Sequence, residues 1–426
     1  MFMTYFTQDN WNEIAALGVE ELQFRLKEQL NQYSGFNLQA TSFTESQLKI
    51  LFEVLKENET ITSLNLSDNN IGEAGGIAIA EALKENKTIT SLDLGGNDIG
   101  AAGGIAIAEA SKENKTITSL NLSDNNIEEA GGIAIAEALK ENKTITSLDL
   151  SGNDIREAGG IAIAKALKEN KTITSLNLGY NKIREAGGIA IAEALKENQT
   201  ITSLNLGYNN IREAVWIAIV EALKENKTIT SLNLSKDYIT DKGAIELIKL
   251  LENNKSILEI TLHDDTSISP DKREEINFLN LQNQTIFREK IERLYKNGID
   301  QSNFRSFMQL LPGIKVILNI ETSSSLKFTV EEQEKMKSLM DQAKRYKQDN
   351  FLILAKICKK TQLDKDESDS LLLRLPHELI CHITSFLSFK DIKSPDEISQ
   401  EVVIPQRVAS KLLDAISYAN KSTLER

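Results

Sequence analysis

Leucines recur at a fixed interval of 28 residues through the middle of the chain, at Leu64, Leu92, Leu120, Leu148, Leu176, Leu204 and Leu232. Around Leu64 the apolar residues alternate with polar ones from Ile61 to Ser67, which is the two-residue period of a strand with one buried face. Further along the unit, Ile77, Ala80 and Leu83 follow helical spacing, which predicts a helix from Glu73 to Glu85. Each unit is therefore predicted to be one strand followed by one helix.

A single strand and helix of this kind cannot bury its apolar side alone, so neighbouring units must stack. Stacked helices need about 10 Å each, whereas paired strands lie only about 4.8 Å apart, so the stack curves with its strands inside. The predicted fold is an α/β solenoid of 28-residue units, with parallel strands on the inner side and helices on the outer side. A mainly helical C-terminal region is expected to follow it.

Each unit also carries the motif L-x-x-L-x-L-x-x-N-x-L, which in the first complete copy is filled by Ile61, Leu64, Leu66, Asn69 and Ile71. In period and pattern the units resemble leucine-rich repeats of the ribonuclease-inhibitor type. This resemblance implies a right-handed horseshoe whose task is to hold another protein.

The asparagine of the motif recurs in six units, at Asn69, Asn97, Asn125, Asn153, Asn181 and Asn209. An amide side chain both donates and accepts hydrogen bonds, so it can join its own turn to the next repeat. We expect these residues to form a structural ladder in which losing one buried partner costs about 1–3 kcal/mol. The seventh unit has Asp237 instead, which predicts a looser turn there because an ionised carboxylate cannot donate.

The changes in pattern along the chain predict four regions. Residues 1–35 are expected to form a helical cap that includes a helix from about Trp11 to Asn31, and residues 36–262 the solenoid. Residues 263–360 are expected to form a helical linker or cap, with one helix up to Lys296 and another from Thr329 to about Lys347. Residues 361–426 begin with an acidic, polar linker.

Differences between the repeats indicate where a partner could bind. The strand positions that face inward are nearly uniform. Ser63 and the equivalent residues of the other repeats are all serine, and Asn65 and its equivalents are only Asn or Asp. Just after the strands the later copies gain the side-chain types that are enriched in binding hot spots, which gives a candidate contact for a client protein on the concave face or adjoining loops. Its members are Tyr180, Tyr208, Tyr238, Arg156, Arg184 and Arg212.

Two alternatives remain open for these residues. The arginines could merely offset the glutamates beside them, Glu157, Glu185 and Glu213, while the tyrosines arose by drift in duplicated copies. The sixth copy also has Val215 and Trp216 in place of a glycine pair, and Trp216 is either an exposed anchor or, as we expect, packing between helices.

Leu373 to Ile392 read LRLPHELICHITSFLSFKDI, in which a leucine-proline pair precedes an amphipathic stripe. The segment resembles the start of an F-box, a family that docks on the Skp-type adaptor of cullin-based ubiquitin ligases. The resemblance rests on Leu375, Pro376, Glu378, Leu379, Ile383, Phe386 and Leu387. The downstream part of a full F-box is missing, as in the short F-box-like ends of repeat proteins from poxviruses and intracellular bacteria. The alternative is an ordinary amphipathic helix packed on the apolar residues that follow, Val408, Leu412, Leu413 and Ile416.

Charge and composition narrow the partners. The 49 Lys and Arg residues against 62 Asp and Glu give a net charge of −13, which disfavours nucleic acid and anionic membranes. Two cysteines, Cys358 and Cys381, cannot form a disulfide framework and fit a reducing cytoplasm. No export signal opens the chain and no apolar run is long enough to span a membrane. Because of the F-box-like end, the expected location of the protein includes the cytoplasm of a host cell, reached after secretion from an intracellular bacterium.

No catalytic chemistry is expected. His263, His377 and His382 lack the spacing of a metal site, and the glycine pairs recur in the repeat register rather than as a phosphate-binding loop. We therefore predict a protein with no enzymatic activity and no cofactor, in which the solenoid holds a client and the C-terminal segment recruits a ubiquitin-ligase adaptor. The alternatives are a scaffold or inhibitor without a ubiquitin link, and a GTPase-activating protein built on the same repeat.

Overall fold

The computed structural model describes residues 5–235, 239–262, 267–300, 303–319 and 328–360. The chain divides into two compact units. The first unit comprises residues 1–290 with 309–328, and the second comprises residues 291–308 with those from 329 onwards.

Ten short strands of the described residues form one parallel sheet in chain order. They are β1 (Tyr5–Phe6), β2 (Gly35–Asn37), β3 (Ser63–Asn65), β4 (Ser91–Asp93), β5 (Ser119–Asn121), β6 (Ser147–Asp149), β7 (Ser175–Asn177), β8 (Ser203–Asn205), β9 (Ser231–Asn233) and β10 (Glu259–Thr261). Leu64 lies opposite Leu92, and each later leucine of the 28-residue series lies opposite the next. The predicted alignment of the leucines on adjacent parallel strands is confirmed.

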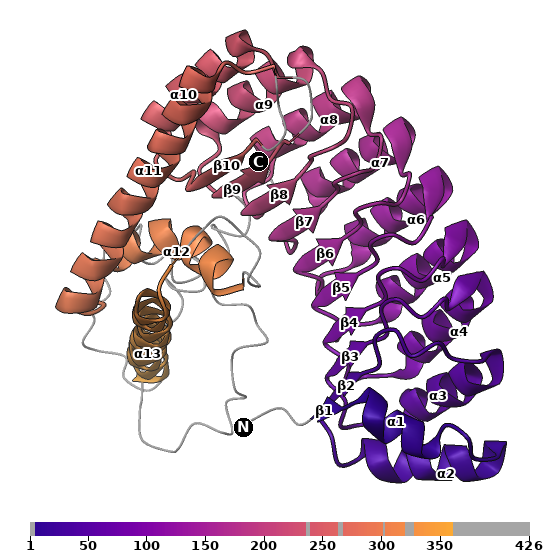
Figure 1. Cartoon of the computed structure of the whole chain (residues 1–426). Helices are drawn as coiled ribbons and strands as arrows, with labels where there is room; N and C mark the ends of the chain where they lie inside the picture. The colour runs from indigo at the N-terminus through magenta and orange to yellow at the C-terminus, as the bar shows by residue number, and fades with distance from the viewer. Residues whose placement is uncertain (1–4, 236–238, 263–266, 301–302, 320–327, 361–426) are drawn as a thin grey trace. The chain divides into compact units, whose positions relative to one another are not determined.

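A helix follows each strand of the repeat array. The helices of the first part of the chain are α1 (Gln8–Ile14), α2 (Val19–Leu30), α3 (Glu45–Glu57), α4 (Gly72–Glu85), α5 (Gly100–Glu113), α6 (Glu128–Glu141), α7 (Arg156–Glu169), α8 (Arg184–Glu197), α9 (Glu213–Glu225) and α10 (Asp241–Asn253). In the first unit the strands line the inner side of an arc and α3 to α10 its outer side (Figure 1). The predicted fold class is confirmed: an open parallel sheet with helices between its strands, followed by a helical region.

The core lies between the sheet and the helices. Ile61, Leu64 and Leu66 on the strand side and Ile79 and Leu83 on the helix side are buried. The same positions are buried in the later repeats, where Leu83 is replaced once, by the buried Ser111. Neighbouring helices approach closely at a glycine pair. A methyl group added at Gly76 would lie 3.1 Å from the Cα atom of Gly103 in the next repeat.

Two predicted helix boundaries are wrong. The single helix expected from Trp11 to Asn31 is two helices, α1 and α2, because Gly18 is extended and begins the second one. The helix expected to end near Lys347 is α13 (Val330–Lys360), which continues because no glycine or proline interrupts it. The remaining helices are α11 (Pro270–Asn297), which ends one residue beyond the predicted Lys296, and α12 (Phe304–Asn319).

The last strand of the array is covered by α11. Asn280 accepts a hydrogen bond from the backbone N–H of Ile260 (3.1 Å) and donates one to its carbonyl (3.0 Å). Gln284 donates to the carbonyl of Leu258 (3.0 Å). These side chains satisfy backbone groups at the end of the sheet, which would otherwise lack a neighbouring repeat.

The second unit is held by its own contacts. Lys335 of α13 bridges Glu292 of α11 (2.8 Å) and Glu331 (2.9 Å), and Phe304 contacts Tyr346 with ring centroids 5.1 Å apart. No helix of the described residues is long and apolar enough to cross a membrane.

Candidate functional site

The chain leaves the strands of the first six repeats, β3 to β8, through a turn with left-handed backbone. At its first left-handed position, φ is 59° at Asp68, 65° at Gly96, 52° at Asp124 and 68° at Gly152, and 58° and 61° at Tyr180 and Tyr208. The backbone N–H of each of these residues donates to a carbonyl of the next repeat, as Tyr180 does to Gly207 at 3.0 Å. The backbone therefore has a fixed task at this position, while the side chain is free to vary.

The motif asparagines lie directly beneath this turn and are fully buried. The amide nitrogen of Asn153 donates to the carbonyls of Leu122, Leu150 and Ser151 at 2.7–3.0 Å. Its Oδ1 accepts from the backbone N–H groups of Asn125 and Ile127 in the preceding repeat. Each amide thus joins consecutive repeats and fixes the position of the turn above it.

In the first four repeats the turn side chains alternate between aspartate and glycine. A methyl group added at Gly96 would lie 2.4 Å from a carboxylate oxygen of Asp68, and one at Gly152 would lie 1.9 Å from a carboxylate oxygen of Asp124. Each aspartate therefore extends over the glycine of the next repeat. The alternation also keeps two carboxylates from lying side by side, an arrangement that would be destabilising.

In the fifth and sixth repeats the same two positions hold a stacked pair of tyrosines. The rings of Tyr180 and Tyr208 are 4.0 Å apart between centroids and inclined by 14°. The side chain of Tyr180 is 56% exposed, and Tyr208 is half-buried. The pair forms an aromatic surface of the array, which we call the tyrosine pair.

The tyrosine pair adopts a backbone that its residue type disfavours. Left-handed φ is uncommon for a bulky residue, whereas glycine takes it without strain and aspartate tolerates it. The equivalent positions Gly96 and Gly152 show that this turn can be built with glycine. Strain that a fold does not need is typical of residues retained for another purpose.

The predicted arginines are exposed but do not share one backbone geometry. Arg156 and Arg184 open α7 and α8 with φ of 59° and 60°, whereas Arg212 has φ of −106° and precedes α9. Within the described part of the chain, no ion pair joins these arginines to the glutamates beside them. Glu213 instead contacts Lys242 at 3.4 Å.

The inner face of the earlier repeats is acidic. Asp93 accepts a hydrogen bond from Asn121 (2.9 Å), and Asp149 accepts one from Asn177 (2.8 Å). The pKa of Asp124 is raised, first by partial burial and then by the charges of Asp149 and Asp68. The polar, mildly acidic inner side expected from the sequence is therefore what the structure has.

Several candidate residues lie outside the described residues. These are Tyr238 of the tyrosine and arginine set, Asp237 of the seventh turn, His263, and the F-box-like residues Leu375, Pro376, Glu378, Leu379, Ile383, Phe386 and Leu387. Trp216 is fully buried, so the expectation of helix packing is confirmed and the exposed anchor is excluded. No cluster of His, Cys, Asp or Glu that could hold a metal ion occurs among the described residues.

Sequence reasoning missed a second asparagine ladder, at the helix C-termini. It begins at Asn58 and recurs every 28 residues to Asn254, and every member is buried. The amide nitrogen of Asn198, for example, donates to the carbonyls of Leu167 (2.7 Å) and Asn170 (3.2 Å). The signal was present, because this series has the same period as the first ladder.

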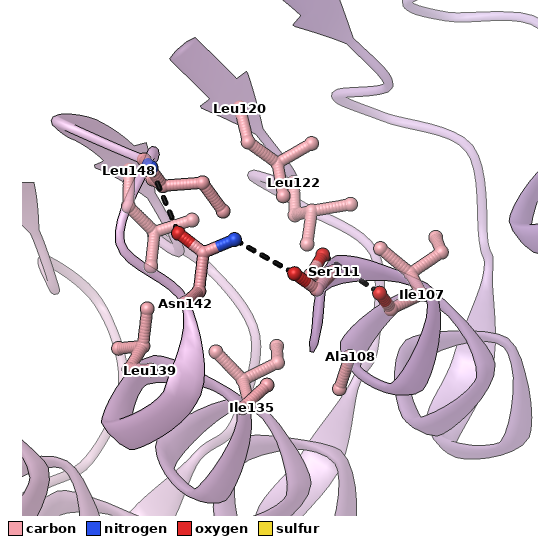
Figure 2. A pocket seen from close by; sticks show the side chains of 11 residues that line it. Ile107, Ala108, Ser111, Leu120, Leu122, Ile135, Leu139, Asn142 and Leu148 are labelled. Atoms are coloured by element: carbon pink, nitrogen blue, oxygen red, sulfur yellow. Dashed lines mark hydrogen bonds between the residues drawn. The ribbon is translucent and has the colours of Figure 1, made fainter. Parts of the chain in front are cut away.

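A small cavity of about 10 Å³ lies in the core of the array beside α5 (Figure 2). It is lined by Ser111 together with apolar residues of the strands and helices around it, among them Leu120, Leu122 and Leu139. Ser111 takes the place of a leucine found in the other repeats. A cavity of this size holds one water molecule at most, so it is a packing defect rather than a ligand site.

Comparison with known proteins identifies the repeats. The leucine-rich repeat family matches residues 57–80, 85–108, 113–136, 141–164, 169–192 and 197–212. The chain is similar to the actin-binding site 2 of leiomodin-1, with 28% identity over 38% of this chain and 93% of that one (TM-score 0.35). It is also similar to the Rad7 and Elc1 complex of yeast, with 13% identity over 63% and 71% (TM-score 0.41).

A third similar structure is the leucine-rich repeat-containing protein LegL7 from Legionella pneumophila, with 21% identity over 65% of this chain and 87% of that one (TM-score 0.41). No curated protein matched the sequence. The aligned leucines, the asparagine ladder and the family match agree, and residues 57–212 are an array of leucine-rich repeats.

Proposed function

We propose that the repeat array holds a client protein and that the tyrosine pair, with the exposed Arg184 and Arg212, is part of the contact. Solenoids of this kind act as interaction scaffolds because stacking creates extended surfaces that a single repeat cannot offer. The observation that carries the proposal is the strained, stacked position of Tyr180 and Tyr208, of which Tyr180 is exposed and Tyr208 half-buried.

The chemistry of this surface suits a protein partner. Tyrosine provides a large apolar ring with a polar hydroxyl, and arginine provides a planar group that packs on rings and pairs with carboxylates. Both residue types are enriched among interface hot spots. Lys182, which pairs with Asp154 at 2.6 Å, lies in the same turn as Tyr180 and adds a further exposed charge.

The chain itself supplies the variant that tests the contact. Changing Tyr180→Asp together with Tyr208→Gly reproduces the aspartate-glycine pair of Asp68 and Gly96, so folding is expected to be preserved. The matched control is Phe24→Ala with Phe278→Ala. It removes two aromatic rings that are 60% and 62% exposed and lie away from the tyrosine pair, on α2 and α11. Proteins captured by the full-length wild type are identified, and the affinity of each purified candidate is then measured with all three chains.

A client that binds the wild type and the phenylalanine control, but binds the tyrosine variant at least about tenfold more weakly, supports the proposal, since hot-spot losses typically exceed 1.4 kcal/mol. Equal affinity of every client for the wild type and the tyrosine variant, with both chains folded by circular dichroism, overturns it.

We further propose that the client is delivered to a ubiquitin ligase. The support is the F-box-like sequence of residues 373–392, with Leu375, Pro376 and the apolar stripe through Leu379, and no described residue bears on it. Such a segment would dock on a Skp-type adaptor, which places the work of the protein in a cytosol. The F-box-like segment and the presence of only two cysteines support a location in the cytosol of a host cell, which the protein would reach by secretion from an intracellular bacterium.

This second step is tested with the purified Skp-type adaptor and the full chain. Binding is measured for the wild type, for Pro376→Lys with Leu379→Asp, and for the control Lys365→Glu in the acidic run before the segment. Loss of binding in the double variant alone supports the adaptor function. No binding by the wild type, or equal binding by all three chains, overturns it and leaves a scaffold or inhibitor without a ubiquitin link.

A further inference from the structure

The second asparagine ladder has a covalent consequence that the repeat motif does not suggest. Its members are all followed by any residue and then threonine or serine, which is the acceptor sequence for N-linked glycosylation. The eight members, with exposed fractions of 0–6%, are Asn58, Asn86, Asn114, Asn142, Asn170, Asn198, Asn226 and Asn254. Asn283 of α11, which donates to the carbonyl of Asn254, is a ninth buried asparagine with an acceptor sequence. An acceptor sequence ordinarily indicates a surface loop of a secreted protein, and here the structure places it in the core.

The buried amides have no room for a sugar. Besides donating to the carbonyls of Leu167 and Asn170 in the preceding repeat, Asn198 accepts from the backbone N–H groups of Thr200 and Ile201, both at 2.9 Å. Transfer of an oligosaccharide replaces one of the two hydrogens on the amide nitrogen by a bond to the first sugar carbon, with release of a proton and the lipid pyrophosphate carrier. One donated hydrogen bond is then lost, and a bulky polar group lies where the preceding repeat packs.

The threonine or serine of the eight ladder sequences also has a structural task, because its backbone N–H donates to the Oδ1 atom of the asparagine. The hydroxyl of Thr88 donates to the carbonyl of Asn58 in the preceding repeat (3.0 Å), and its backbone N–H donates to Asn86 (3.0 Å). Stacking of the repeats therefore explains why asparagine and threonine recur at this spacing. No glycan is needed to account for the pattern.

We infer that this chain folds in a compartment that lacks N-linked glycosylation, and that its nine buried acceptor sequences are stacking motifs incompatible with a glycan. In a eukaryotic secretory compartment the transferase acts on the chain as it enters, before the repeats stack. Modification at any of the nine positions then prevents the ladder from closing. The inference concerns where the fold can form and is independent of which client the array holds.

The test expresses the full chain in one eukaryotic host in three ways: in the cytosol, with a cleavable export signal, and with the same signal while N-linked glycosylation is inhibited. Folded protein is measured by circular dichroism and by the thermal unfolding transition, and glycan positions are mapped by mass spectrometry. Mapping is needed because Asn65, Asn121 and Asn233 on the inner face are also acceptor sequences and are only half-buried.

We expect the exported chain to carry glycans on the buried ladder and to give at least about tenfold less folded protein than the same chain with the inhibitor, which should match the cytosolic form. Folded chains with a glycan on any of the nine buried asparagines would overturn the inference. Folded exported chains in which all nine remain bare would overturn it too, because folding would then outrun the transferase. A chain that misfolds equally with the inhibitor also counts against it, since glycans would not be the obstacle.

Discussion

Replacing Ser111 by leucine should stabilise the array, because the other repeats provide the packing template. The equivalent residues are leucines that are at most 2% exposed, namely Leu55, Leu83, Leu139, Leu167, Leu195, Leu223 and Leu251. Ser111 is buried but fills less space, and its hydroxyl donates to the carbonyl of Ile107 in its own helix (2.8 Å). Figure 2 shows the apolar side chains that face the resulting cavity.

The magnitude follows from three effects. Burying a leucine side chain contributes about 1.5–3 kcal/mol. Loss of the serine hydrogen bond removes about 0.5–1.5 kcal/mol. The cavity of about 10 Å³ is smaller than the added side chain, so α5 must move slightly outwards, but α4 and α6 already accommodate leucine at this position. We therefore expect a net gain in stability of about 1 kcal/mol. In a site that could not expand, overpacking would cost about 1–3 kcal/mol and cancel this gain.

Equilibrium urea unfolding followed by circular dichroism measures the effect, together with amide hydrogen exchange in α5 and α6. Ser111→Leu should raise the unfolding midpoint and slow exchange in both helices. The control Leu139→Ser introduces the same serine one repeat later and should cost about 2–5 kcal/mol. A lower midpoint for Ser111→Leu than for the wild type would refute this expectation, because it would mean that position 111 cannot accommodate a leucine as the equivalent positions of the other repeats do.

Three further predictions concern the ladders, the cap and the acidic face. Asn153→Asp removes the donor from a buried rung and should cost about 1–3 kcal/mol in urea unfolding, whereas the exposed control Asn210→Asp should cost under about 0.5 kcal/mol; equal costs would contradict the ladder. Asn280→Leu leaves the backbone N–H and carbonyl of Ile260 without their hydrogen-bond partner, so hydrogen exchange of the Ile260 amide should become at least about tenfold faster. Unchanged exchange would mean that α11 does not cap the sheet. The raised pKa of Asp124 means that its charge costs stability above the unfolded pKa, and that this cost disappears as pH falls through the folded value. Asp124→Asn should therefore raise the melting temperature at neutral pH but not in acid, and an equal gain at both would exclude charge as the cause.

The array could be predicted well from the sequence because the same pattern of apolar and polar residues recurs in every repeat. The leucine period, the strand and helix of each unit and the parallel stacking all follow from burying one apolar side, and the structure has them. The helix boundaries outside the array were less predictable. The break at Gly18 and the length of α13 depend on single residues in segments without a repeated template.

The geometry of the candidate surface could be predicted only in part. Position along the repeat placed Tyr180 and Tyr208 just after their strands, but the left-handed backbone of that turn is not visible in the apolar pattern. The stacking of the two rings also depends on that backbone, since it directs both side chains alike from adjacent repeats. The change of geometry at Arg212 accompanies Val215, which replaces a glycine: in the preceding repeat a Cβ atom at the equivalent Gly187 would lie 2.5 Å from Cγ2 of Ile183, so a valine requires a different local backbone.

The turn after each strand separates the requirements of folding from those of recognition. Its backbone donates to the next repeat, and the side chain of the asparagine beneath it binds the preceding repeat, so neither task depends on the side chain at the first left-handed position. Where nothing else is required, this position holds an aspartate and a glycine in alternation, which suits the backbone and keeps charges apart. A pair of adjacent tyrosines suits the backbone less well, since each bears a left-handed φ that costs on the order of 1 kcal/mol. The stacking of their rings returns about 0.5–1.5 kcal/mol, so folding alone gives no clear reason to prefer them. Binding of the proposed client would supply the missing reason, because the side chain at this position can change without loosening the stack.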